Sequence, residues 1–204
     1  MNFSLKILLV FIFAMPVLAM DFSLQHPEDL KEQYTLELLK ALRAVHDLEK
    51  WEFTDKVHID KTAIPHSHPI LTLHARHGRK NQKDMLLSTY LHEQIHWLTD
   101  ENIESTNLAI GKLKIAFSKV AVGFPEGARD EDSTYLHLIV CYLELKALGD
   151  YLSESRVKTV LEFWKKDHYT WIYHQVELHQ DLIAKIITES GLTLGDKTHV
   201  SSKN

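Results

Sequence analysis

The chain has 204 residues, of which 45% are hydrophobic and 25% are charged, and it contains 14 histidines and a single cysteine. This length and composition suit one folded domain and exclude a disordered or low-complexity chain. The formal net charge of −5 argues against a general affinity for nucleic acid through a basic surface. One cysteine excludes an intrachain disulfide and a metal cage built from cysteines alone.

Residues 1–19 have the pattern of an export signal. Lys6 supplies a positive charge, an apolar run follows, and cleavage is expected after Ala19. The apolar run is shorter than the roughly 20 residues that a membrane-spanning helix needs. We therefore expect a periplasmic or secreted protein that is not held at a membrane once the leader is removed. The mature chain is expected to form one domain over 20–191, followed by a flexible tail at 192–204.

The predicted elements begin with a helix that Pro27 and the acidic residues after it open, because these residue types favour a first helical turn. Short alternating segments punctuated by prolines follow, and they predict two strands. The pattern then stays helical almost to the end, except for a glycine- and proline-marked loop at 123–127. The expected helices cover about 27–50, 82–99, 101–120, 133–149, 153–166 and 168–189, and the expected strands about 56–60 and 70–76. Ser133 or Thr134 is expected to cap the helix that starts there. The fold class is therefore α+β and predominantly helical, with a small mixed or antiparallel sheet and a helical bundle.

The segment from Leu86 to Leu98 carries the residues best suited to catalysis. His92 and His96 are four residues apart in a helical stretch, so both imidazoles leave the same face of the helix one turn apart. Two histidines at this spacing can bind one metal ion, and a glutamate directly after the first, here Glu93, can act as general base in metal-assisted hydrolysis. The alternative is a pair of surface histidines that make ordinary contacts along the helix.

The residues from Thr89 to Leu98 resemble the active-site helix of the zincin metallopeptidases, in which uncharged residues flank the two histidines. No Gly-x-x-His follows His96, so the chain is less similar to the metzincins than to the gluzincins, which take their third zinc ligand from a glutamate on a later helix. This resemblance implies a zincin-like fold, one Zn²⁺ per chain and the hydrolysis of peptide bonds in a peptide or protein substrate.

The candidate third ligand is Glu144, which lies in the most apolar predicted helix of the mature chain. A carboxylate buried in such a helix must be paired or bound to a metal, since an isolated buried charge is too costly. His137 and Cys141 share a helical face with Glu144 and remain alternatives, as do Asp100 and Glu104. The expected metal ligands are thus the two histidines of the motif and Glu144.

Two further tasks need residues from elsewhere in the chain. In many gluzincins an aspartate four residues after the ligand glutamate orients a zinc-bound histidine, but Leu148 stands at that position here. We therefore expect Asp100 or His137 to orient that histidine. His168 or Tyr169 is the candidate catalytic donor that stabilises negative charge on the substrate oxygen, and the alternative is that these rings only pack a helix onto the core.

The strand expected at 70–76 directly precedes the active-site helix. The corresponding edge strand of zincins pairs with an extended substrate, which is a form of strand addition. The alternative is an ordinary half-buried strand with His74 facing water. The other histidines, including His66 and His68, are expected at the surface without a role as ligands.

The function that these residues predict is that of an exported zinc-dependent metallopeptidase, with Glu93 as the general base. Two alternatives remain at this point. One is a periplasmic metal-binding or chaperone protein in which the histidines buffer zinc. The other is a zincin-fold binding module that has lost catalysis.

Overall fold

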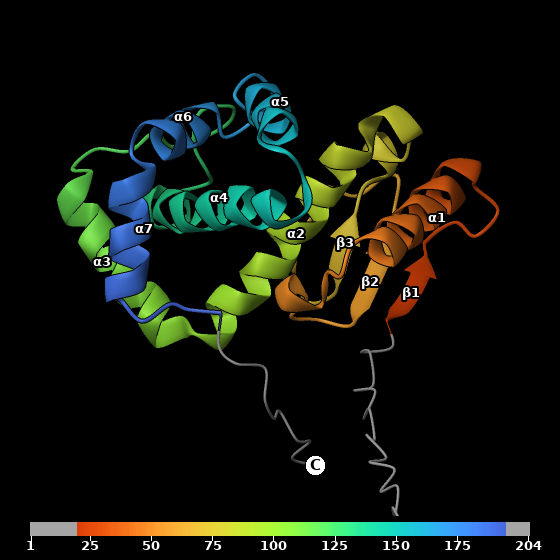
Figure 1. Cartoon of the computed structure of the whole chain (residues 1–204), viewed down its shortest axis with the longest axis horizontal. Coiled ribbons are helices and arrows are strands. Elements are labelled where there is room, and N and C mark those ends of the chain that lie inside the picture. The colour runs from red at the N-terminus through yellow and green to blue at the C-terminus, as the bar shows by residue number, and fades with distance from the viewer. Residues whose placement is uncertain (1–19, 195–204) are drawn as a thin grey trace, which may run out of the picture.

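The structure is a computed structural model that describes residues 20–194, so the predicted leader at 1–19 and the residues at 195–204 lie outside the described part. The described chain is predominantly helical with a small sheet, which confirms the predicted fold class in its coarse form (Figure 1). Its elements are β1 (Asp21–Leu24), α1 (Leu30–Val45), β2 (Lys56–Ile59), β3 (Leu71–Leu73), α2 (Lys83–Glu101), α3 (Ile103–Ala116), α4 (Glu131–Tyr151), α5 (Glu154–Trp164), α6 (Thr170–Leu178) and α7 (Gln180–Glu189). None of the helices within residues 20–194 is both long and apolar enough to cross a bilayer.

The sheet is parallel throughout, with the strand order β1-β2-β3. Val57 in β2 lies opposite Phe22 of β1 and Leu71 of β3. The two predicted strands are confirmed, but the expectation of a mixed or antiparallel sheet is wrong, and β1 is an additional strand. Alternation of apolar and polar residues predicts a strand without giving the direction of its partner. Here α1 connects β1 to β2, and a helical crossover of this kind joins parallel strands.

The long helix α2 lies between the sheet and the other helices (Figure 1). It contacts α1 and β3 on one side and α4 and α5 on the other. Apolar side chains of α2 are therefore buried on both sides, with Leu87, Leu91 and Ile95 fully enclosed. The polar residues of the His-Glu-x-x-His motif sit on this helix, so they lie in a largely dry environment.

Gln94, inside the motif, fixes the rotation of α2 against the sheet side. Its side-chain oxygen accepts hydrogen bonds from the backbone N–H groups of Phe53 and Thr54 at 2.6 and 2.9 Å, and its nitrogen donates to the Thr54 carbonyl at 3.0 Å. Gln94 is two residues from both His92 and His96, and two residues turn a helix by about 200°. Anchoring Gln94 to the segment before β2 therefore turns both histidines toward the helical side.

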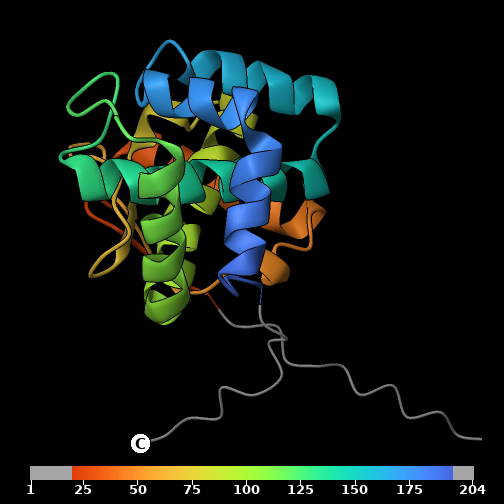
Figure 2. The ribbon, with the colours of Figure 1, turned by 90° about the vertical axis from the view of Figure 1, so that its left-hand side faces the viewer.

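In the helical part, α4 is covered by α3 and α7, which lie side by side, and by α6 (Figure 2). The helix predicted at 168–189 is in fact two helices, α6 and α7, that change direction at His179. Helical spacing continues through this junction, so the sequence alone does not show the break. The N-cap of α4 is Asp130, whose side chain accepts from the Ser133 N–H at 2.7 Å, and not Ser133 or Thr134.

Candidate metal centre

Three histidines converge on the wall of one cavity. His92 and His96 come from α2, and His137 comes from the first half of α4. One ligand nitrogen of each ring lies within 4.8 Å of those of the other two. The ring centroids are 5.0 to 5.6 Å apart. All three rings line a cavity of about 870 Å³. The structure thus joins both motif histidines with a residue that the sequence left as an alternative ligand.

Hydrogen bonds define which nitrogen of two of these rings is available. His92 Nδ1 lies 2.9 Å from the Glu144 carboxylate, and His137 Nδ1 lies 2.6 Å from the backbone carbonyl of Ser133. A carbonyl and a carboxylate accept hydrogen bonds, so each Nδ1 carries a proton, and Nε2 is the nitrogen that can bind a metal when the ring is neutral. Histidines that bind metal in proteins almost always make a hydrogen bond of this type with the other ring nitrogen.

Glu144 lies at the centre of a buried hydrogen-bond network. Besides the bond to His92, its carboxylate accepts a hydrogen bond from the Tyr173 hydroxyl at 2.8 Å and another from the Ser88 hydroxyl. Ser88 in turn accepts from the indole nitrogen of Trp164 at 2.7 Å. Glu144 is 1% exposed, and it does not form a ligand group with both histidines of the motif. The geometry therefore favours Glu144 as the group that orients His92, and favours His137 as the third ligand.

The remaining candidates from the sequence lie elsewhere. Cys141 is buried and groups with His92 and Glu144 rather than with the three histidines. Asp100 is exposed and pairs with His68 at 3.2 Å, so it is not the orienting acceptor that the sequence suggested. Glu104 is exposed on α3.

The relative direction of α2 and α4 explains this arrangement. Ser88 and His92 contact Glu144, near the end of α4, whereas His96 contacts His137, near its start. The contacts therefore run in opposite directions along the two helices, as Figure 1 also shows. His137 and Glu144 are separated by about 10 Å along α4, which is two helical turns. Only one of them can reach the side of the pair that contains His96.

Glu93 lines the same cavity and is 6% exposed. Burial raises the pKa of its carboxyl group to about 7, and the nearby charges of His92 and His66 act in the opposite direction. A carboxyl group with a pKa near the working pH can both accept and return a proton. The residue that the sequence predicts as general base thus has the burial and pKa that this role requires.

The three rings differ in their electrostatic environment. Burial lowers the pKa of His137 to about 3 and that of His96 well below its ordinary value, so both rings stay neutral. Burial also opposes the charged form of His92, but hydrogen bonds to Cys141 and Glu144 raise its pKa well above the ordinary value. A histidine must be neutral at the coordinating nitrogen to bind a metal. His96 and His137 therefore meet this condition without a metal. The His92 ring is polarised by the carboxylate of Glu144, and it must lose a proton before its Nε2 can bind a metal.

His168 and Tyr169, the predicted donors to the substrate oxygen, also line the cavity. The Tyr169 ring lies 4.4 Å from that of His137, and burial raises the pKa of its hydroxyl group, which therefore stays protonated. Tyr169 has φ 53°, a left-handed conformation that is uncommon for a residue other than glycine and typical of functional sites. His168 Nδ1 donates to Asp167 at 2.7 Å, and Arg76 donates to the same carboxylate oxygen at 2.8 Å.

The outer edge of the sheet does not offer β3 to a substrate strand. Thr72 of β3 exchanges two backbone hydrogen bonds with His66, at 2.7 and 3.1 Å, in an antiparallel bridge. The three residues of β3 are buried, so the strand is not half-exposed either. His74 accepts a hydrogen bond from the Arg76 N–H and lines the cavity. The segment 64–67 therefore forms the cavity wall where the sequence predicts an open edge strand, and the expected addition of a substrate strand to β3 is wrong.

Several residues of the site have no signal in the sequence. Ser88 is the exception, because it precedes His92 by one turn and shares its helical face. Tyr173, Trp164 and Arg76 come from distant segments. Only the packing of α6 against α4, and of α5 and the loop after β3 against α2, brings them to the site.

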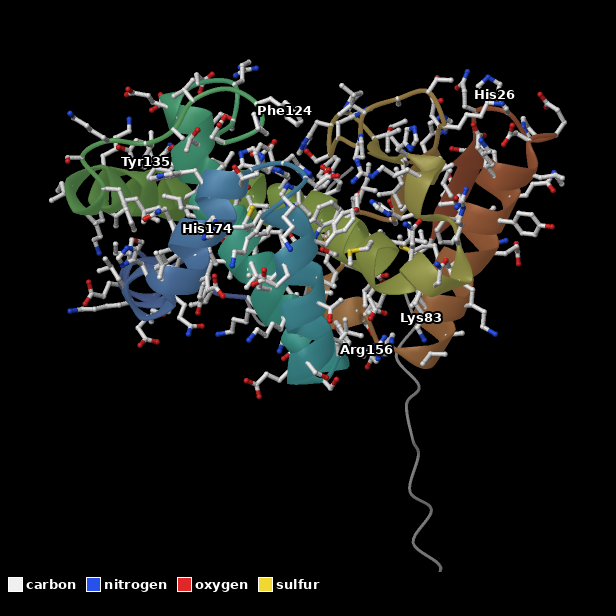
Figure 3. All side chains as sticks on the ribbon, turned by 90° about the horizontal axis from the view of Figure 1, so that it is seen from above. His26, Lys83, Phe124, Tyr135, Arg156 and His174 are labelled. Atoms are coloured by element: carbon white, nitrogen blue, oxygen red, sulfur yellow. The ribbon has the colours of Figure 1, made fainter. Side chains whose placement is uncertain are left out.

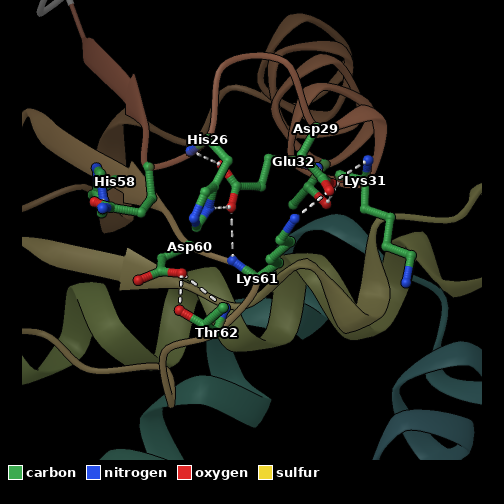
Figure 4. Close-up of polar contacts among 10 residues, drawn as sticks. His26, Asp29, Lys31, Glu32, His58, Asp60, Lys61 and Thr62 are labelled. Carbon is green, nitrogen blue, oxygen red and sulfur yellow. Dashed lines mark hydrogen bonds and ion pairs between the residues drawn. The ribbon is translucent and has the colours of Figure 1, made fainter.

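A second group of possible ligands, His26, Glu32 and Asp60, lies near the sheet (Figure 4). Glu32 is fully buried and already accepts hydrogen bonds from His26 N at 2.7 Å, His26 Nδ1 at 2.9 Å and Lys61 N at 3.0 Å. Asp60 accepts two hydrogen bonds from Thr62. These donors use the carboxylate lone pairs that a metal needs, so this group is a structural clamp between the start of α1 and the loop after β2.

Replacing Glu32 by glutamine is expected to lower the free energy of unfolding by about 1–3 kcal/mol at pH 7, because a side-chain amide faces buried N–H donors. Burial opposes ionisation, but the hydrogen bonds from Lys61 and His26 hold the pKa of Glu32 below its ordinary value. Its stabilisation is therefore present above the pKa of the unfolded chain and is lost as the pH falls through the folded-state pKa. Urea unfolding at several pH values from about 3 to about 7 measures the loss of unfolding free energy in the variant and its dependence on pH.

The matched control for this variant is Glu37→Gln on the exposed face of α1, where the carboxylate pairs only with Lys40. This change is expected to cost less than about 0.5 kcal/mol. Equal losses in the two variants contradict the assignment of Glu32 as a structural clamp.

No protein-family model, curated protein or solved structure matches this chain. Its function is therefore inferred from the geometry of the site.

Proposed function

We propose that this protein is an exported zinc-dependent metallopeptidase of the zincin type. The observation that carries the proposal is the convergence of His92 and His96 with His137, with the buried Glu93 on the same cavity. The proposed export rests on the pattern of residues 1–19.

The donor set fits zinc. Three imidazole nitrogens are a known ligand set for catalytic Zn²⁺, and three protein ligands leave a fourth position open for water or substrate. Nitrogens at their observed separation need only small side-chain movements, since zinc–nitrogen bonds are about 2.0–2.1 Å long. The hydrogen bond from His92 to Glu144 supplies the outer carboxylate that orients a metal-bound imidazole.

A bound zinc ion supplies Lewis acidity toward a peptide carbonyl and lowers the pKa of a water molecule. The residues of the chain then have separate tasks. Glu93 accepts the proton of the attacking water and returns it to the leaving amine, which its pKa near neutrality allows. The Tyr169 hydroxyl donates a hydrogen bond to the substrate oxygen as negative charge develops there. His168, whose Nδ1 proton is held by Asp167, offers Nε2 as an acceptor for a peptide N–H.

The open cavity favours an enzyme over the two alternatives. A silent binding module is expected to fill its cleft with its own side chains, whereas here a cavity of about 870 Å³ reaches the three histidines and Glu93. A zinc buffer needs no buried glutamate beside its ligands, and it binds more than one metal ion per chain.

Removing the metal tests the proposal. The mature protein is expected to bind one Zn²⁺ per chain and to cleave peptides in a mixed library, and a chelator is expected to abolish cleavage until zinc is restored. The loss of the metal also lowers the melting temperature, because zinc binds only the folded chain. Mass spectrometry of the peptides measures cleavage, and metal analysis of the same sample measures the zinc content. Cleavage that persists in metal-free protein contradicts the proposal, and a stoichiometry well above one without cleavage favours the zinc buffer.

A further inference from the structure

The mouth of the cavity carries two bulky apolar side chains that are almost fully in solvent. Among the described residues, three large apolar side chains are at least 80% exposed: Ile64 at 85%, Phe124 at 80% and Ile115 at 85%. Two of these three, Ile64 and Phe124, line the cavity that contains the three histidines. Exposed apolar side chains that gather at a cavity, rather than scatter, mark a binding surface.

Phe124 is held in place by a well-bonded loop between α3 and α4. The Pro125 and Glu126 carbonyls accept hydrogen bonds from the first N–H groups of α6, those of Thr170 and Trp171, at 3.0 and 3.1 Å. The start of α6 is the segment that follows Tyr169 in the site. Figure 3 shows Phe124 on this loop, on the side that faces the loop between β2 and β3. The position of the Phe124 ring is therefore coupled to the catalytic side of the cavity.

Ile64 is presented by the opposite loop, which is bonded just as firmly. His66, two residues on, exchanges both backbone hydrogen bonds with Thr72 of β3. The Ser67 carbonyl accepts a hydrogen bond from the indole of Trp97 on α2 at 2.9 Å. Two separate loops thus hold an apolar side chain at the rim, while the floor between them carries the histidines and Glu93.

We propose that Ile64 and Phe124 select substrates with bulky apolar residues beside the peptide bond that is cleaved. This inference rests on the proposed function, because it names the substrate class of the same site. The occupant is a peptide, since both side chains line the cavity that leads to Glu93 and the three histidines. A peptide side chain that covers either residue removes apolar surface from water at both partners, which favours binding.

The test compares Ile64→Ser and Phe124→Ser with Ile115→Ser, an equally exposed isoleucine on α3 that does not line the cavity. Each protein is incubated with zinc and a decapeptide library randomised at its four central positions. The wild type is expected to cleave beside Leu, Ile, Phe or Met at least about tenfold more efficiently than beside Ser or Asn. Each rim variant is expected to reduce this preference by about three- to tenfold, a loss typical of one partly buried apolar contact. Ile115→Ser is expected to leave it unchanged.

A binding measurement separates this inference from the proposed hydrolysis. The same library is captured on the Glu93→Gln protein, with and without each rim substitution, and the bound peptides are sequenced. If no protein cleaves but apolar peptides are enriched and the rim variants abolish the enrichment, the substrate class stands and the hydrolase proposal fails. If the wild type cleaves and the preference is the same in all variants, the inference is overturned. It is also overturned if the rim variants only weaken binding to phosphatidylglycerol vesicles, because the rim is then a lipid contact.

Discussion

Replacing Glu93 by glutamine is expected to lower kcat/KM for peptide cleavage by at least about 10²-fold while zinc stays bound. The amide has almost the same shape as the carboxyl group but cannot accept the proton of the attacking water, and general base catalysis typically contributes about 10²–10⁴-fold. Glu93 is not among the proposed zinc ligands, which are the three converging histidines, so the affinity for zinc is expected to change by less than about threefold. Steady-state cleavage and equilibrium dialysis against zinc measure the two quantities.

The matched control is Glu104→Gln, on the exposed surface of α3. It makes the same carboxyl-to-amide change and is expected to alter neither cleavage nor zinc binding. Cleavage that survives in the Glu93 variant at more than about a tenth of the wild-type rate excludes Glu93 as the general base. A Glu93 variant that loses both zinc and activity shows instead that this residue acts through metal binding.

The second large effect concerns the assignment of His137 and Glu144. Replacing His137 by glutamine or alanine is expected to remove tight zinc binding, because two imidazoles and no third nitrogen remain. Replacing Glu144 by glutamine is expected to weaken zinc binding by only about 10–100-fold, the usual cost of losing an outer partner of a metal-bound histidine. Titration with a competing zinc chelator at constant pH distinguishes these outcomes.

Each of these variants removes a buried side chain or charge, so the folded state must be checked first. Circular dichroism and thermal unfolding of the metal-free proteins show whether the helices are intact. The glutamine at position 137 serves as the less disruptive of the two His137 variants, since it fills more of the space than alanine does. If Glu144→Gln loses zinc as completely as the His137 variants, or if His137→Gln retains tight binding, the assignment of His137 as ligand and Glu144 as outer partner is contradicted.

The agreement between sequence and structure is best where the information is local. The helical segments, the two strands at 56–59 and 71–73, and the common face of His92 and His96 all follow from periodicity along a few turns of chain. The low polarity of the sequence around Glu144 correctly indicates a buried and hydrogen-bonded carboxylate. The break at His179 is missed, because helical spacing continues across it while the packing changes.

The sheet shows the same limit in another form. Alternation identifies β2 and β3, but their parallel pairing depends on how the intervening chain passes between them. The outer edge of β3 is paired with His66, a residue that the sequence places at the surface without a role. Whether an edge strand is free depends on where a loop folds back, and that is decided by contacts distant in sequence.

The sequence by itself determined that this chain is a helix-rich domain whose His92, Glu93 and His96 share one helical segment, since helical periodicity is a property of the local backbone. It also placed three of the five candidate third ligands, His137, Cys141 and Glu144, on one face of the helix predicted at 133–149. Only the tertiary structure decided which residue on that face has which position. Because α2 and α4 contact each other in opposite directions, His137 meets His96 and Glu144 meets His92. If the two helices packed in the other direction, His137 and Glu144 would exchange places relative to the two histidines of α2. No local pattern in either helix encodes the packing direction.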